Sequence, residues 1–233
     1  PAIERPLWSE LSEEYFVFEL PPMDGLCRPE LLGGQQSRWL AGLVRLDGQP
    51  LGSAEIAESL RLCLSYRPDD LFVADWAAAV LIDRDCDETL QVIEFANLQL
   101  LEFREIDNRL DDRLATAYGF IHSLARSRLP FWRFHTRQVR ALGELKVEAN
   151  SVFERTGNAL KLVGDQYLAR AYRLLASRFH LDAWEQSIKR SLDVLESVYR
   201  AVSNQAATYR LEFLEAIIVV LILFEIGMAL LRH

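Results

Sequence analysis

The carboxyl-terminal segment of this chain constrains its fold more than any other part of the sequence. Ala216–Phe224 is an unbroken apolar run, and the wider segment Phe213–Leu231 contains only Glu215 and Glu225 as charged residues. Built as a helix, the wider segment would be about 28 Å long, which is close to the thickness of a bilayer's hydrocarbon core. We therefore predict a C-terminal transmembrane helix within residues 211–233. The alternatives are a helix buried in the protein core and a helix in an oligomer contact.

Residues 1–86 have a different pattern, with frequent Pro and Gly and short runs of β-forming residues. A short helix is predicted from Ser53 onwards, and four runs are predicted as strands: 15–20, 39–46, 71–76 and 77–83. This combination predicts a small α/β head domain.

From Asp87 onwards, apolar residues recur at steps of three and four, which predicts a helical stalk over residues 87–210. Breaks near Pro130 and His180 divide the pattern into three helices, at about 87–128, 136–179 and 182–210. The predicted fold class is therefore α+β. It has a small N-terminal α/β head, a long antiparallel helical stalk with coiled-coil seams, and one C-terminal transmembrane helix.

Charge and cysteine content argue against several functions. The net charge of −8 is unfavourable for a general nucleic-acid-binding protein. Cys27, Cys63 and Cys86 have no CxxC spacing, so they indicate neither a metal site nor a disulfide framework. The sequence contains no phosphate-binding loop and no recognisable pairing of a nucleophile with a base. We predict a non-catalytic protein that uses no metal and no cofactor, and the sequence identifies no small-molecule ligand.

A basic segment with interleaved aromatic residues lies between the first two predicted stalk helices. Aromatic side chains favour the bilayer interface, and arginines favour anionic headgroups. We predict a second contact with the membrane surface here. RNA binding through residues 126–140 and a solvated basic face are the alternatives. The residues concerned are Arg126, Arg128, Phe131, Trp132, Arg133, Phe134, Arg137 and Arg140.

Polar residues interrupt two of the apolar patterns. Asp107 takes a seam position in the first stalk helix, with Asn97 and Arg104 nearby, and we predict that these residues fix the register of packing. A catalytic role for Asp107 is the weaker alternative. Within the tail, Glu215 and Glu225 are predicted to lie in contacts between chains, with an interfacial position or an ion path as alternatives for Glu225.

Four stretches of the chain resemble the required-for-meiotic-nuclear-division family, also called YagE-type domain proteins. They are YRPDDLFVADWAAAVLID, EFANLQLLEFREIDNRLD, LVGDQYLARAYRLLASRFHLDAWEQSIKRSLDVLESVYR and YRLEFLEAIIVVLILFEIG. The resemblance covers roughly residues 66–230 and is that of a bacterial member. It implies a membrane anchor and a large homo-oligomer, and it carries the further possibility of a membrane-tethered factor that supports translation.

These observations together predict a membrane-anchored, homo-oligomeric scaffold or assembly protein. Lys189, Arg190, Arg200 and Arg210 precede the tail and only Arg232 follows it, which places the bulk of the chain on the cytoplasmic side of a bacterial inner membrane. The predicted partners are the lipid bilayer and other copies of the chain. The alternative function is an ion-transport or channel-like oligomer with Glu225 near a pore.

Overall fold

A computed structural model describes residues 11–22, 34–124, 143–154 and 165–231 of the chain, with side chains described for only part of 202–231. The chain packs as two compact units. We call residues 1–108 and 149–188 the first unit, and residues 109–148 and 189–233 the second unit. Each unit combines segments that are distant in the sequence.

A four-stranded mixed sheet forms the centre of the first unit. Its strands are β1 (Phe16–Leu20), β2 (Cys63–Leu64), β3 (Leu71–Ala74) and β4 (Ala78–Ile82), in the spatial order β1-β4-β3-β2. β1 runs parallel to β4, whereas the β3–β4 and β2–β3 pairs are antiparallel. Every residue of β3 and β4 is buried, as expected for central strands that are covered on both faces.

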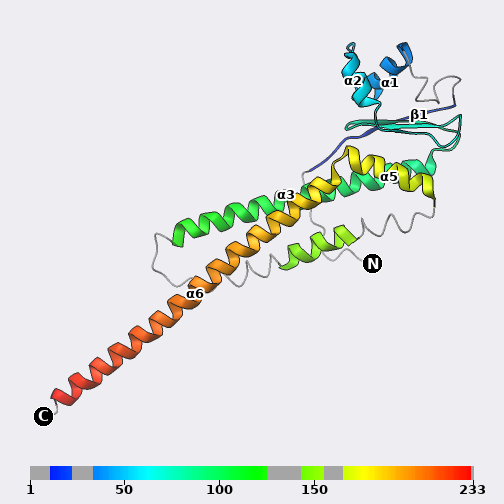
Figure 1. Cartoon of the computed structure of the whole chain (residues 1–233). Helices are drawn as coiled ribbons and strands as arrows, with labels where there is room; N and C mark the ends of the chain where they lie inside the picture. Colours follow the sequence, from blue (N-terminus) through cyan, green and yellow to red (C-terminus); the bar gives the residue numbers. More distant parts are fainter. Residues whose placement is uncertain (1–10, 23–33, 125–142, 155–164, 232–233) are drawn as a thin grey trace. The chain divides into compact units, whose positions relative to one another are not determined.

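Two short helices, α1 (Gln35–Arg45) and α2 (Ser53–Ser59), cover one face of this sheet (Figure 1). Side chains alternate between the faces of a strand, so Leu71 and Val73 of β3 and Val80 of β4 point the same way. They form one apolar cluster with Leu40 and Val44 of α1.

The other face of the sheet is covered by α5 (Gln166–Arg178) and the first part of α3 (Asp87–Leu124) (Figure 1). α5 begins at an N-cap, because the Asp165 carboxylate accepts a hydrogen bond from the backbone N–H of Tyr167 at 2.6 Å. α5 and α3 are joined by a buried hydrogen bond of 2.5 Å from the Tyr172 hydroxyl to the side-chain oxygen of Gln99.

The second unit contains the end of α3, part of a helix over residues 143–154, and most of α6 (Leu181–Leu231). Its buried side chains include Leu110 of α3 together with Leu192 and Leu195 of α6. Ion pairs Arg109–Glu148 and Lys146–Glu196 lie around this core.

The strand predicted at 39–46 is a helix. Leu40 and Val44 are fully buried at a spacing of four residues, while Trp39 is 43% exposed. That pattern fits the helical period of 3.6 residues, and the short run had been misread as an alternating strand. The strands predicted at 15–20, 71–76 and 77–83 are confirmed as β1, β3 and β4.

The predicted transmembrane anchor is wrong. The apolar tail is the end of one continuous helix of 51 residues. Within the ranges that the structure describes, no helix combines the length and the apolar character that crossing a bilayer requires. A physical reason is that the unbroken run Ala216–Phe224 would extend only about 14 Å, roughly half of a hydrocarbon core, before a glutamate on either side. The predicted fold class and the location in a bacterial inner membrane are corrected with it.

The apolar seam of α3 follows the predicted positions, with one change of register. Ile93, Ala96, Leu100, Phe103 and Leu110 are buried as expected. At the predicted polar interruption, Ile106 is the buried residue, and Asp107 is only half-buried. Steps of three and then four residues pass through Ile106 without a gap, so Asp107 lies beside the seam.

Candidate functional site

The most unusual chemical feature of the first unit is a buried carboxylate. Asp75 follows the last residue of β3 and is 1% exposed. Its position is fixed by the tight turn between β3 and β4, where its backbone N–H donates to the carbonyl oxygen of Ala78 at 2.9 Å. One carboxylate oxygen accepts a hydrogen bond of 2.7 Å from the backbone N–H of Trp76. The sequence therefore places a charge at the end of a fully buried strand.

Two arginines from different helices pair with Asp75. Arg45 Nε lies 2.9 Å from Asp75 Oδ2, and Arg178 Nε lies 3.6 Å from Oδ1. Both arginines occupy the last turn of their helix, α1 and α5, where the helix dipole favours a positive charge. The ends of two helices are in this way tied to one strand turn.

Arg178 is also almost fully buried and uses its remaining donors on backbone groups. It donates to the carbonyl oxygens of Ala74 at 3.2 Å, Glu58 at 3.1 Å and Ser59 at 3.2 Å, and it pairs with the Glu58 carboxylate at 3.4 Å. A buried guanidinium is tolerated only with such partners. We call Tyr15, Arg45, Glu58, Asp75 and Arg178 the Asp75 cluster.

Burial and neighbouring charges change the pKa of two members of the Asp75 cluster. Burial, and next the negative charge of Asp75, raise the pKa of Tyr15, whose hydroxyl donates to the Asp75 carbonyl oxygen at 3.0 Å. A hydrogen bond from Arg61 lowers the pKa of Glu58. The contacts of the cluster hold α1 and α5 against the turn that follows β3.

One buried oxygen of the cluster, among the described residues, lacks a hydrogen bond. Among the described residues, Asp75 Oδ2 accepts no hydrogen bond of good geometry, although Arg45 Nε is 2.9 Å away. The reason is that Arg45 Nε donates to the Ser59 hydroxyl, also at 2.9 Å. Arg45 and Asp75 therefore form an ion pair, while the Nε–H of Arg45 points toward the Ser59 hydroxyl.

A second charged group lies between two tryptophans of the same unit. Arg104 forms an ion pair with Glu13, and its guanidinium carbon is 5.7 Å from the ring centre of Trp76 and 6.0 Å from that of Trp184. These are cation–π distances. Arg104 had been predicted as a register-fixing residue of the stalk, and the structure places it against the N-terminal segment and two indoles.

The other predicted register residue, Asn97, donates from its side chain to the carbonyl oxygen of Ile93 at 2.9 Å, within its own helix. Glu215 is exposed on α6, and the side chain of Glu225 lies outside the described atoms. The eight arginine and aromatic residues predicted to contact a membrane surface lie between 126 and 140, which is outside the described residues.

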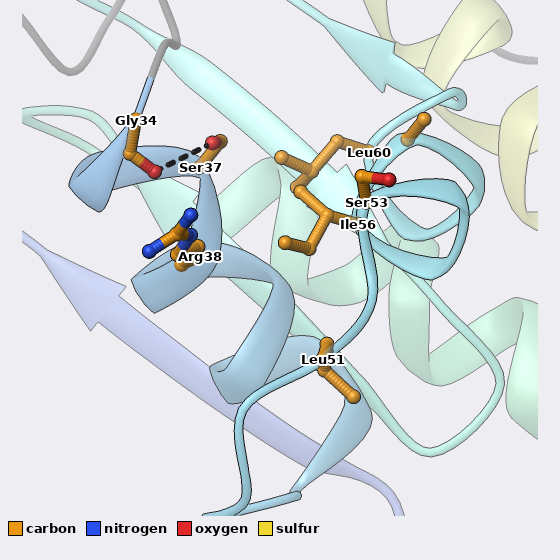
Figure 2. A pocket seen from close by; sticks show the side chains of 8 residues that line it. Gly34, Ser37, Arg38, Leu51, Ser53, Ile56 and Leu60 are labelled. Atoms are coloured by element: carbon orange, nitrogen blue, oxygen red, sulfur yellow. Dashed lines mark hydrogen bonds between the residues drawn. The ribbon is translucent and has the colours of Figure 1, made fainter.

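A cavity of about 400 Å³ lies between α1 and α2. Figure 2 shows Ile56 of α2 and Leu60, the residue after α2, facing Ser37 of α1 across it. The volume would admit a small ligand, but ligand sites also need several convergent polar groups. The Ser37 hydroxyl donates to the Gly34 carbonyl oxygen at 3.1 Å, and Arg38 and Ser53 are the other polar residues of the lining. These few polar groups give no chemistry to assign.

Metal binding finds no support in the described part of the chain, where no group of three or more His, Cys, Asp or Glu side chains could hold an ion. Cys86 is partly buried, and burial followed by the nearby charge of Glu19 raises the pKa of its thiol. A thiol with a raised pKa is a weak ligand and a weak nucleophile.

The third candidate site is an apolar surface on the last turns of α6. Its exposed side chains range from 40% exposed at Ile217 to 59% at Leu221. We call these residues the α6 apolar segment: Ile217, Ile218, Val219, Leu221, Ile222 and Met228. Contiguous apolar surface of this kind marks interaction sites in proteins.

The Asp75 cluster could not be found from the sequence, because its members are spread from Tyr15 to Arg178 and match no motif. The available signal was weak. Asp75 directly follows the buried run Leu71–Ala74, and Arg178 ends an apolar helix pattern. By contrast, the α6 apolar segment was recognised from the sequence as the least ordinary part of the chain.

Comparison with known proteins gives similarity without a known activity. Residues 1–88 match the family model described as "Uncharacterized protein MJ0711, N-terminal domain". The chain is also 26% identical over 193 residues to the uncharacterized protein MJ0711 of Methanocaldococcus jannaschii. That match covers 82% of this chain and 58% of MJ0711, so the chain spans little more than half the length of this relative. No solved structure matches the chain.

These comparisons contradict the resemblance to the required-for-meiotic-nuclear-division family. The stretches that carried that resemblance are mainly amphipathic helices and one apolar tail, and many unrelated helical proteins share such patterns. The N-terminal match falls instead on the part of the chain that contains α1, α2 and the sheet.

Proposed function

We propose that this protein is a non-catalytic scaffold that self-associates through the α6 apolar segment. The observation that carries the proposal is the exposure of six large apolar side chains within twelve residues of one helix. The proposed partner is a second copy of the same chain, because an apolar helix surface complements itself when two copies meet.

The energetics of this segment favour burial. Covering one Leu, Ile or Val side chain is worth about 1.5–3 kcal/mol relative to leaving it in water. Three such side chains per copy would offset much of the free energy that association costs, which is at least about 4 kcal/mol. Val147 and Val194 are also exposed apolar residues of the second unit, and single exposed residues of this kind are ordinary for a protein surface.

The charged residues of the first unit support the non-catalytic part of the proposal. Asp75 pairs with both Arg45 and Arg178, and these arginines pair in addition with Glu55 and Glu58, so each of these charges has a partner of opposite sign. The role of the cluster is to hold the α/β unit together, while the α6 apolar segment is the part that faces a partner. An ion-transport assembly and a translation factor stay predictions that no observation here favours.

The test is the mass of the full chain in solution. Sedimentation velocity over a hundredfold range of protein concentration should show wild-type species heavier than a monomer. The double substitution Leu221→Ser with Ile222→Ser should shift the distribution to the monomer. Both residues are exposed, so the change leaves the packed core of the second unit intact.

A matched control is the double substitution Val147→Ser with Val194→Ser, which also removes two exposed apolar side chains from the same unit. This control should assemble like the wild type. A wild-type chain that stays monomeric at all concentrations would contradict the proposal. So would equal effects of the two double substitutions. Assembly that appears only after a different protein is added would show a partner of another kind and would also contradict self-association.

A further inference from the structure

A second cavity of the first unit, of about 640 Å³, lies along one face of α1. The helix lines it with residues that are three and four positions apart, from Gln35 to Leu43, and such residues share one face of a helix. Phe18 of β1 and residues 46–51, which follow α1, form its other sides. We call this cavity the α1 groove. Its volume is within the range of sites that hold small organic molecules.

The apolar part of the α1 groove contains an exposed tryptophan. Trp39 is 43% exposed, and among the described residues its indole has no aromatic or cation–π contact. Trp76 of the same unit, by contrast, contacts Phe179 and Arg104. Small-molecule sites are lined mainly by apolar and aromatic side chains, so the free face of Trp39 is suited to contact an apolar ligand.

Leu46, beside Trp39 in the lining, has a backbone conformation that leucine rarely adopts. It directly follows α1 with a φ of 52°, in the left-handed region where glycine is favoured because it has no Cβ. Its side chain lines the α1 groove and is 45% exposed. A leucine at this position lowers the stability of the fold without being fully buried, as is expected of a residue that contacts a ligand.

Arg38 gives the α1 groove a positive charge. It is exposed, and within the parts of the chain that the structure describes its side chain forms no ion pair and no hydrogen bond. Arg45, seven residues later on the same helix, pairs instead with two carboxylates. Arg38 and Leu51 line both the α1 groove and the smaller cavity, and both are labelled in Figure 2. An unpaired guanidinium beside apolar side chains complements an anionic group that is attached to an apolar body.

The acidic residue of the α1 groove lies at its other end. Asp47 is nine residues after Arg38, which corresponds to about 13 Å along a helix axis. The Asp47 carboxylate accepts a hydrogen bond of 2.8 Å from the backbone N–H of Gln49. An anion that pairs with Arg38 is therefore well separated from the negative charge of Asp47.

We infer that the α1 groove binds a small organic acid, whose apolar body lies on Trp39 and Leu46 and whose anionic group pairs with Arg38. This site goes beyond the proposed self-association and does not depend on it. The α1 groove belongs to the first unit, whereas the α6 apolar segment belongs to the second.

Two dyes that differ in one charge test the inference. Anilinonaphthalene sulfonate has an apolar ring system with one anionic group, and phenylnaphthylamine is its uncharged analogue. Both fluoresce more strongly when they leave water, so fluorescence titration measures their affinity. The full chain is used with Leu221→Ser and Ile222→Ser, because the exposed residues of the α6 apolar segment could otherwise bind either dye.

The expected result is saturable binding of the anionic dye that depends on Arg38. Arg38→Gln should weaken this binding about tenfold or more, as the loss of one charge-assisted hydrogen bond predicts, and should leave the uncharged dye unaffected. Arg67→Gln is the matched control, because Arg67 is also an exposed arginine of the first unit but lies outside the α1 groove. It should bind both dyes like the parent chain.

Leu46→Gly tests the apolar part of the site, since glycine suits the backbone at this position and only the side chain is lost. It should weaken both dyes about tenfold, while far-ultraviolet circular dichroism shows an unchanged helix content. Equal binding of the anionic dye by Arg38→Gln and its parent would overturn the inference, and so would equal weakening of both dyes by Arg38→Gln. Failure of the parent chain to bind either dye would also overturn it and would leave the α1 groove as a surface for a protein partner.

Discussion

The first unit buries charged side chains, whereas the end of α6 exposes apolar ones. In the first unit, ionic side chains are buried: Asp75 is 1% exposed, and Arg178 is nearly as well covered. At the end of α6, aliphatic side chains are exposed, with Leu221 at 59%. Buried charges are costly unless they are paired, and exposed apolar side chains are costly unless they are covered.

The two regions also differ in whether these unfavourably placed side chains have partners within the chain. The buried charges are paired within the chain, because α1 and α5 each supply an arginine to Asp75 in the turn that follows β3, and α2 supplies Glu58 to Arg178. The exposed apolar residues have no comparable cover among the described residues. Buried charges that are paired within the chain indicate a structural role. Apolar side chains that stay exposed indicate a surface for a partner.

The largest effect is expected from removing the negative charge of Asp75. Asp75→Asn keeps the size of the side chain and the oxygen that accepts the hydrogen bond from Trp76, but it leaves the buried Arg178 without its buried counter-charge, with only the more exposed Glu58 as an ionic partner. Breaking a buried ion pair in this way costs about 3–5 kcal/mol. Urea denaturation followed by circular dichroism should show this loss in the free energy of unfolding.

The control for Asp75→Asn is Asp69→Asn, which breaks an exposed ion pair with Arg84. Exposed pairs contribute only about 0–1 kcal/mol. If the two substitutions lowered the free energy of unfolding equally, the Asp75 cluster would not hold the first unit together. The contrast between the first unit and the end of α6 would then be wrong.

The next effect concerns the α6 apolar segment and appears in association rather than in the fold. Leu221→Ser with Ile222→Ser should remove the dependence of the unfolding midpoint on protein concentration, because assembly stabilises the folded chain by mass action. At the lowest protein concentration, the free energies of unfolding of the variant and the wild type should differ by less than about 0.5 kcal/mol, as is usual for surface substitutions. A large loss at high dilution would mean that these residues pack within their own chain.

A smaller effect is expected at high pH. Burial of the hydroxyl raises the pKa of Tyr172 from 10.0 to about 12. The folded chain therefore keeps this proton between pH 10 and 12, while the unfolded chain loses it. The stability that is fully present below pH 10 falls across this window, by at most about 1.4 kcal/mol per pH unit for one proton.

Tyr172→Phe should reduce that slope and also lower stability at pH 7 by about 0.5–1.5 kcal/mol through the lost hydrogen bond. Unfolding titrations at half-unit steps between pH 9 and 12 measure both quantities. Tyr118→Phe is the control, because Tyr118 is half exposed. An unchanged slope in Tyr172→Phe would place the alkaline sensitivity elsewhere.

The smallest effect is expected at Glu58, which shares Arg178 with Asp75 but remains well exposed. The hydrogen bond from Arg61 holds the pKa of Glu58 below its ordinary value of 4.5, so its contribution is present at neutral pH and is lost as the pH falls through the lowered pKa. Glu58→Gln should change the melting temperature at pH 7 by little more than the error of differential scanning calorimetry. If Glu58→Gln destabilised the chain as much as Asp75→Asn does, the exposed Glu58 and the buried Asp75 would contribute equally to stability, which would contradict the prediction.

Local patterns predicted most of the secondary structure of this chain. The two central strands and the long helix from Asp87 both follow from the short-range spacing of apolar residues. The run at 39–46 was misjudged because eight residues are too few to separate a period of two from one of 3.6. The tail was recognised as unusual, but its apolar content alone was read as a membrane anchor, and that reading was wrong.

The sequence could not predict the Asp75 cluster, since no local pattern reports which distant side chains will meet. Asp75 and Arg178 are brought together only by the packing of α5 on β2 and β3. Likewise, the place of Arg104 between Trp76 and Trp184 depends on three segments that are far apart in the chain. Long-range contacts of charged groups are fixed by tertiary structure, and the local patterns of a single sequence do not contain that information.

The origin of Arg178 has a consequence for how the chain matures during synthesis. The segment similar to the MJ0711 N-terminal domain ends at residue 88, yet the guanidinium that neutralises Asp75 is made about ninety residues later. Until α5 has left the ribosome, the nascent sheet carries an acidic group with only one of its two cations. The amino-terminal part should therefore stay incompletely folded during translation and close cooperatively once three quarters of the chain has emerged.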